Sequence, residues 1–179
     1  MAHNDAQAFA VWITGLPSSG KSTLARALKA QLGAQGHKVA ILESDALRNI
    51  LSDQPPRYDD AGRDAFYRLM AHIGGLLVEN GVPVIFDATA NRRAYRDRAR
   101  RRIGRFLEVY VECPLDICMA RDPKGIYRVA REDPENRVPG LQAPYEPPEE
   151  PDIVVRADQE PPEGAAARVI AKLVDRSYL

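Results

Sequence analysis

The stretch GLPSSGKST at residues 15–23 is the part of this sequence that decides the fold. Its glycines and its Gly-Lys-Ser ending fit G-x-x-x-x-G-K-[ST], a pattern whose bent backbone directs several N–H groups at phosphate oxygens. The apolar run AVWIT at 10–14 precedes it and predicts a buried strand. KSTLARALKAQLGAQG at 21–36 follows it, with leucines at helical spacing. Because the pattern requires a strand before and a helix after, the sequence predicts a phosphate site at the helix start.

Two side chains of this loop have the chemistry of an ATP site. Lys21 is expected to reach the terminal phosphates, and the Ser22 hydroxyl is expected to ligate Mg²⁺. The residues expected to contact ATP are Gly15, Leu16, Pro17, Ser18, Ser19, Gly20, Lys21, Ser22 and Thr23. The alternative is a chance turn of Gly, Ser and Pro, which leaves the flanking strand and helix unexplained.

Strand-like and helix-like segments alternate along the rest of the chain. Further strands are predicted at 38–44, 83–89, 106–114 and 152–158, and further helices at 45–51, 61–80, 93–103, 115–122 and 161–179. This alternation predicts an α/β fold, with a five-stranded parallel sheet and helices on both faces. The length predicts one domain over 1–179. Its long segment at about 121–150, helix-like and then Pro-rich, is interpreted as a lid.

The composition of the chain limits which partners and which cellular compartment are expected. The chain has 179 residues, with 25 Lys and Arg against 25 Asp and Glu, so its formal net charge is zero. This balance argues against nucleic-acid and membrane partners, because these usually bind to broad basic surfaces. No stretch approaches the roughly 18 apolar residues of a membrane span, and two cysteines suit a reducing compartment. We therefore expect a cytoplasmic protein.

Acidic residues stand at the ends of two predicted strands. Asp45 follows the strand at 38–44, and Asp87 lies near the end of the strand at 83–89. Because ligands of open parallel sheets bind beyond the carboxyl ends of the strands, both acids should face the phosphate site. One acid can orient Mg²⁺ and another can accept a proton from an attacking hydroxyl. The alternatives are a helix cap for Asp45 and a satisfied strand-end carboxylate for Asp87.

Cations and one aromatic ring are spaced to meet an anionic acceptor. Arg48 lies one helical turn beyond Asp45, and Arg63 follows a loop that contains Tyr58. Bidentate arginine contacts and ring stacking suit an anionic ligand with a flat base. In the predicted lid, Lys124 precedes Gly125, so that a mobile cation could close over the transferring phosphoryl group. For most other arginines, including those of RRAYRDRARRR at 92–102, a solvated helix face is the favoured interpretation, with Arg93, which opens the helix after the strand at 83–89, as the exception.

Several stretches together resemble the adenylylsulfate (APS) kinase family. The resemblance covers nearly the whole chain and is most specific in FLEVYVECPLDICMARDPKGIYRVAR at 106–131 and PYEPP at 144–148. Members of this family move the γ-phosphate of ATP to the 3′-hydroxyl of APS and so make PAPS. The resemblance therefore implies a kinase that uses ATP and Mg²⁺, takes APS as its small-molecule acceptor and forms a homodimer.

Position by position, the resemblance assigns roles to residues already singled out. Asp45 matches the last residue of the family's Asp-Gly-Asp, a base or metal-orienting acid, which makes Lys21, Asp45 and Lys124 the expected catalytic residues. Independently of the resemblance, the phosphate-loop pattern and the strand-end positions make Ser22, Asp45 and Asp87 the expected metal-site residues. The expected acceptor-binding residues are Asp45, Arg48, Tyr58, Arg63, Lys124, Gly125 and Leu141.

The sequence also departs from the family around the acceptor. Phe66 stands where the family usually has Asn, Val138 replaces a stacking aromatic, and Ala90 replaces a serine. Asp87 is an added acid in a strand ending, Asp-Ala-Thr, that is similar to other small P-loop kinases. Two alternatives stay open: a kinase of this build acting on another small hydroxyl compound or nucleotide, and a non-catalytic nucleotide-binding module.

Overall fold

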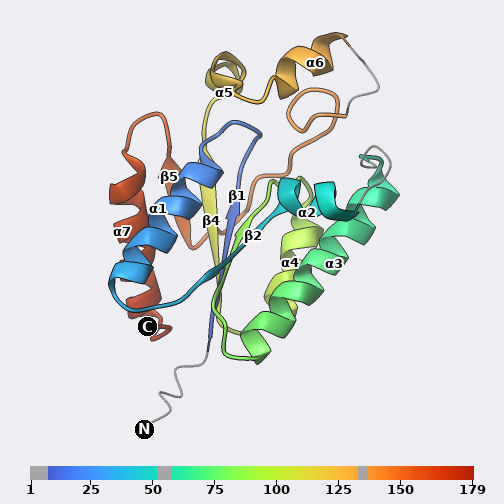
Figure 1. Cartoon of the computed structure of the whole chain (residues 1–179). Helices are drawn as coiled ribbons and strands as arrows, with labels where there is room; N and C mark the ends of the chain where they lie inside the picture. Colours follow the sequence, from blue (N-terminus) through green and yellow to red (C-terminus); the bar gives the residue numbers. More distant parts are fainter. Residues whose placement is uncertain (1–7, 52–57, 133–136) are drawn as a thin grey trace, which may run out of the picture.

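The first strand, β1 (Ala10–Thr14), lies at the centre of a five-stranded parallel sheet with the order β2-β3-β1-β4-β5 (Figure 1). The other strands are β2 (Ala40–Glu43), β3 (Val84–Asp87), β4 (Phe106–Glu112) and β5 (Ile153–Arg156). This computed structural model describes residues 8–51, 58–132 and 137–179. The predicted parallel sheet is confirmed, and each strand lies within its predicted segment.

Helices cover both faces of the sheet, as predicted. Figure 1 shows α1 (Lys21–Ala34) and α7 (Pro162–Asp175) on one face, and α3 (Asp60–Glu79) and α4 (Arg93–Arg102) on the other. The shorter helices are α2 (Ser44–Leu51), α5 (Leu115–Arg121) and α6 (Ile126–Glu132). Helices α5 and α6 lie beyond the carboxyl ends of the strands. In the part of the chain that is described, no helix is long and apolar enough to cross a membrane.

The alternation of side chains along β1 separates two hydrophobic cores. Val11 and Ile13 pack with the leucines of α1 and with α7, whereas Trp12 packs with α3 and α4. Trp12 stacks on Phe86 of β3 with ring centroids 4.5 Å apart, and its Nε1 donates to the Ala88 carbonyl at 3.1 Å. The indole therefore fixes the backbone immediately after Asp87, the last residue of β3.

A third hydrophobic cluster joins the predicted lid to the phosphate loop. It contains Cys113, Cys118, Tyr127, Ala130 and Val138. The buried Tyr127 of α6 donates its hydroxyl hydrogen to the Pro17 carbonyl at 2.9 Å. Val138, at the position of a stacking aromatic in the family, is buried in this cluster and is 4% exposed. The base of the 121–150 segment is thus packed against the body of the protein.

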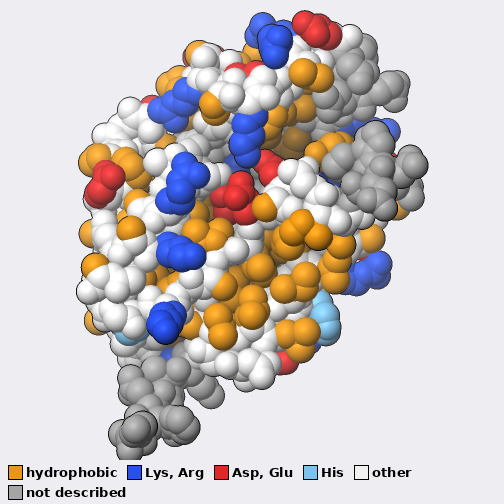
Figure 2. Space-filling model, in the orientation of Figure 1, with side chains coloured by type: hydrophobic (Ala, Val, Ile, Leu, Met, Phe, Trp, Pro, Cys, Tyr) orange, Lys and Arg blue, Asp and Glu red, His pale blue; other side chains and the backbone are white. Residues whose placement is uncertain are grey.

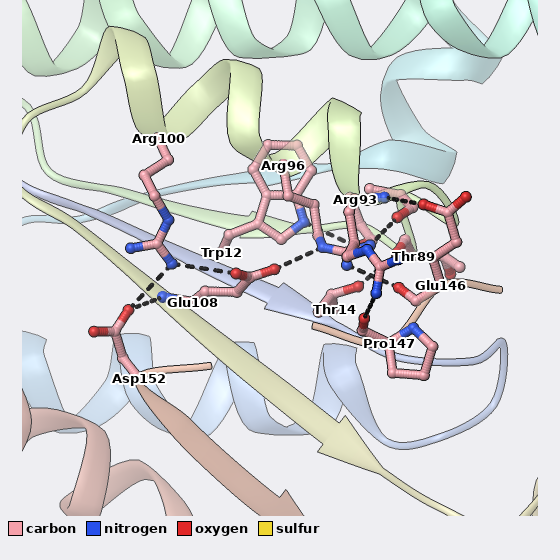
Figure 3. Close-up of polar contacts among 12 residues, drawn as sticks. Trp12, Thr14, Thr89, Arg93, Arg96, Arg100, Glu108, Glu146, Pro147 and Asp152 are labelled. Atoms are coloured by element: carbon pink, nitrogen blue, oxygen red, sulfur yellow. Dashed lines mark hydrogen bonds and ion pairs between the residues drawn. The ribbon is translucent and has the colours of Figure 1, made fainter. Parts of the chain in front are cut away.

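A buried ion pair fixes the chain that returns from this segment (Figure 3). Arg96 of α4 is 1% exposed and donates to Glu108 of β4 at 2.6 Å. It also donates to the carbonyls of Ala90 and Glu146. A single guanidinium therefore ties the loop after β3 and the segment around Glu146 to the middle of the sheet.

Candidate active site

The phosphate loop is held open by residues of unusual backbone geometry. Gly20, immediately before α1, has φ 108°, and Ser18 has φ 61°, a value that is uncommon for a residue with a side chain. At Gly15 an added Cβ would lie 2.5 Å from the Val111 carbonyl oxygen, so β4 leaves room only for glycine. The loop is therefore bent as the sequence pattern predicts, with the N-terminus of α1 at its end.

Lys21 is folded back over this loop. Its Nζ donates to the Leu16 carbonyl at 2.7 Å, and the residue is 8% exposed. Burial lowers the pKa of Lys21, while the negative charges of Asp87 and Asp45 act in the opposite direction. An anionic phosphate chain would favour the charged ammonium further.

A cavity of about 730 Å³ opens over the carboxyl ends of the strands, as the sheet topology requires. Its walls bring together Lys21 and Ser22 of the phosphate loop, Asp45, Asp87 and the lid residue Lys124. Figure 2 shows acidic and basic side chains close together in a hollow at this level of the molecule. The catalytic and metal-site residues expected from the sequence therefore share one cavity.

The acids of this cavity come from neighbouring strands and from the helix after β2. Glu43 and Asp87 are register partners at the ends of β2 and β3, and Asp45 lies in the first turn of α2. Asp45 Oδ2 accepts a hydrogen bond from Lys124 Nζ at 2.7 Å, and Glu43 Oε1 lies 3.9 Å from the same nitrogen. The hydrogen bond to Asp45 raises the pKa of Lys124, although burial acts against it. Asp87 is only 4% exposed.

The expected acceptor residues Arg48 and Tyr58 lie in an aromatic cluster beside this cavity. The Arg48 guanidinium carbon is 3.7 Å from the centroid of Phe66, 5.1 Å from that of Tyr58 and 5.6 Å from that of Tyr67. Arg48 and Asp45 are three residues apart on α2 and so share a side of that helix. The cluster therefore places a buried guanidinium one helical turn from a cavity carboxylate.

Arg63, the second expected acceptor arginine, is engaged by the protein itself. Its Nε donates to the Tyr58 carbonyl at 2.8 Å, and its terminal nitrogens donate to Asn91 Oδ1 at 3.4 Å and to the Arg137 carbonyl. Arg63 therefore links three segments of the chain through hydrogen bonds. Sequence reasoning missed Asn91, which is 2% exposed and also donates to the Pro144 carbonyl at 2.9 Å. The sequence could have indicated Asn91 by its position, four residues after Asp87 and so just beyond a strand end.

The remaining expected acceptor residues lie around the lid. Gly125 has φ 67°, so the chain turns there in a conformation that favours glycine, next to Lys124. Leu141 is 38% exposed and follows Gly140, whose added Cβ would lie 2.8 Å from Leu16 of the phosphate loop. Ala90 is fully buried with φ 40°, and its N–H donates to the Tyr67 hydroxyl at 3.0 Å.

A glycine-bent phosphate loop, a lysine above it and strand-end acids on a five-stranded parallel sheet define the class of P-loop kinases. Residues 7–156 match the sequence profile of the adenylylsulphate kinase family. An adenylyl-sulfate kinase of Microcystis aeruginosa is 37% identical over 169 residues, which are 94% of this chain and 93% of that protein. The chain belongs to the adenylylsulphate kinase family.

Other relatives agree on the family and show how far the fold extends. A probable adenylyl-sulfate kinase of Pyrococcus abyssi is 35% identical over 97% of this chain and 99% of that protein. The APS kinase of Mycobacterium tuberculosis, solved with AMPPNP and APS, is 31% identical with a TM-score of 0.87 over 94% of this chain and 98% of its own. A gluconokinase of Sinorhizobium meliloti, 17% identical with a TM-score of 0.62 over 96% of this chain and 94% of its own, shares the fold alone.

Proposed function

We propose that this chain transfers the γ-phosphoryl group of ATP to the 3′-hydroxyl of APS, with PAPS and ADP as products. One observation carries the proposal: Asp45 faces the phosphate loop in the same cavity as Lys21 and is held there by Lys124. A carboxylate across the gap from a phosphate chain is what the attack of a hydroxyl requires. The membership of the family supplies APS as the acceptor.

Each residue then has a defined task in the transfer. The amides of residues 15–23 bind the ATP phosphates, and Lys21 and Lys124 stabilise the charge on the transferring group. Asp45 takes the proton of the 3′-hydroxyl while the oxygen of that hydroxyl bonds to the γ-phosphorus. The bond between that phosphorus and the bridging oxygen breaks, and ADP leaves. For Asp45 to act, Lys124 has to exchange its contact with the carboxylate for one with the phosphates.

The oxygen donors of the cavity suit Mg²⁺ bound together with ATP. Among the described residues no three His, Cys, Asp or Glu side chains form a metal cluster by themselves. This fits Mg²⁺, which usually takes one or two carboxylates together with substrate phosphates and water. Ser22 and Asp87 line the same cavity and would hold it, while Asp45 in that cavity serves as the base. When bound, the ion would neutralise charge on the phosphate oxygens.

A coupled assay of ADP release, with APS compared against a panel of small alcohols and nucleosides, tests the proposed reaction. We expect turnover with APS, and turnover only with another acceptor would overturn the proposal. Asp45→Ala should lower turnover by roughly two orders of magnitude or more and leave ATP affinity little changed. The matched control is Asp116→Ala on the exposed side of α5. Tight ATP binding without transfer to any acceptor would instead indicate a nucleotide-binding module.

Specific departures favour the second candidate, a kinase of this build with another small acceptor. Asp87 adds a buried acid to the cavity, and Val138 is buried away from it in the third cluster. The acceptor panel decides between the two, because both predict the same dependence on Asp45.

Two further expectations about the whole chain stay predictions. One is a single domain over 1–179 whose segment 121–150 closes as a lid. Its moving part would be the short stretch around Lys124, since Tyr127 holds α6 on the phosphate loop. The other is the homodimer. One solved relative is described as a hexameric APS kinase from Thiobacillus denitrificans, 28% identical with a TM-score of 0.71, of which the match covers 30%. Light scattering at assay concentrations measures the mass of this chain in solution.

A further inference from the structure

Arg48 is a buried cation that the described protein leaves without hydrogen bonds. It is 7% exposed, and its recorded contacts are with the faces of aromatic rings. Among the residues that the structure describes, none accepts a hydrogen bond from its guanidinium. A buried guanidinium normally has its donors satisfied, because an unpaired buried charge is costly. The geometry therefore suits a ligand that supplies the missing acceptors.

Phe66 is the ring that fixes this guanidinium. It lies in the second turn of α3, with its centroid 3.7 Å from the Arg48 guanidinium carbon. Phe66 in turn packs edge-on against Tyr67, with centroids 5.3 Å apart at 74°. Tyr67 is 3% exposed and accepts a hydrogen bond from the Ala90 amide. The ring under Arg48 is thus held by the α3–β3 core.

Stacking on a ring leaves the N–H donors of a guanidinium free, whereas a hydrogen bond to the protein uses them. A ring attracts the flat face of the cation, while the five N–H donors lie in the plane of the guanidinium and point elsewhere. An amide side chain at the same place would use some of these donors. Arg63 illustrates that other arrangement, since its donors are directed at carbonyl and amide oxygens of the protein.

We propose that Phe66 is a positioning residue that holds Arg48, one of the expected acceptor residues, by its ring face, so that the in-plane Arg48 donors stay available to the acceptor. This inference rests on the proposed function, since it names one part of the same acceptor site. It assigns the two predicted acceptor arginines different tasks. Arg48 contacts the acceptor, and Arg63 ties together the segments around it.

Steady-state kinetics of Phe66→Leu and Phe66→Tyr test the proposal. Phe66→Leu removes the ring and keeps an apolar side chain, so the KM for APS should rise about tenfold while the KM for ATP stays unchanged. Phe66→Tyr keeps the ring and should restore the wild-type KM. The matched control is Phe106→Leu, because Phe106 also lies under an arginine, with 5.0 Å between its centroid and the Arg100 guanidinium carbon, but this arginine donates to Glu108 and Asp152 of the protein itself. It should leave both KM values unchanged.

A double-mutant cycle separates positioning from simple packing. In an Arg48→Met background, Phe66→Leu should raise the KM for APS no further, because the cation that Phe66 holds is absent. An equal rise with and without Arg48, or a rise in the KM for ATP to match, would overturn the inference. Wild-type protein that turns over another acceptor and not APS would overturn the proposed function instead, so the two failures are distinct. Melting temperatures of all variants are compared with that of Phe106→Leu.

Discussion

Lys21 lies almost out of reach of water, yet it has to present a charge to a phosphate. Its exposed fraction is 8%, and within the described part of the chain its Nζ donates to one acceptor, the Leu16 carbonyl. Burial lowers the pKa of Lys21 from its ordinary 10.5 even though Asp87 and Asp45 favour the charged form. Bound phosphates add negative charge at the same place and raise the pKa again.

This change in pKa makes nucleotide affinity depend on alkaline pH. Between the lowered pKa of the empty site and the ordinary 10.5, part of the protein has a neutral Lys21 that must gain a proton when ADP or ATP binds. Affinity should therefore fall as pH rises through this window, with proton uptake on binding. Calorimetry in two buffers of different ionisation enthalpy measures the uptake. Lys21→Met should abolish it, and persistence of the uptake in that variant would assign it to another group.

Asp87 is the acid that this chain adds at the end of β3. It is buried at the wall of the cavity and acts on the charge of Lys21. Asp87→Asn should weaken binding of the metal with ADP about tenfold, the order of effect seen for groups that hold a metal through its bound waters. Titration of Mn²⁺ by electron paramagnetic resonance, with Asp116→Asn as control, measures this without turnover. Unchanged Mn²⁺ binding would restrict Asp87 to the electrostatics of Lys21.

At the scale of elements, α4 is held to the sheet by the buried pair of Arg96 and Glu108. Figure 3 shows Arg100 and Asp152 joined to the same network, with Arg100 3.2 Å from Glu108 and 3.4 Å from Asp152. Arg96→Met removes the closest partner of the buried Glu108 carboxylate and leaves it the partly exposed Arg100 at 3.2 Å, so the change should cost about 3 kcal/mol of unfolding free energy. The control Arg98→Met breaks a half-exposed pair with Asp64 and should cost at most about 1 kcal/mol. Urea unfolding compares the two, and equal losses would contradict a buried role for Arg96.

The elements themselves were predictable because each follows from a local pattern. The first strand was predicted at its observed bounds from an apolar run, and α1 was placed by the leucine spacing after the phosphate loop. The packing of the 121–150 segment was not predictable, because the contact of Tyr127 with Pro17 joins residues 110 positions apart. For the same reason the sequence could mark Arg63 as a cation near the acceptor but could not show that Tyr58, Asn91 and Arg137 engage it.

At the scale of the whole molecule, the fold identifies the chemistry better than the acceptor. The phosphate loop and the parallel sheet follow from the sequence, and the same architecture is shared with a gluconokinase at 17% identity. We expect acceptors to be distinguished by the few side chains at which this chain departs from the family, such as Phe66 of α3, Asp87 at the end of β3 and Val138 of the third cluster. Their effect depends on burial and on neighbours, which spacing along the chain does not reveal.

The distribution of charge over the molecule gives a final prediction about acceptors. The net charge is zero, and arginines at the start of α4 and along it are paired with acids of other elements: Arg92, immediately before α4, with Asp60, Arg98 with Asp64, and Arg102 with Glu79. Paired arginines release few counterions, so oligonucleotides with a 5′-hydroxyl should bind weakly, with a shallow dependence on salt, and should not be phosphorylated. Fluorescence anisotropy between about 50 and 200 mM salt, together with the ADP-release assay, measures both. Tight binding with a steep salt slope, accompanied by turnover, would instead place this chain's acceptor among polynucleotide ends.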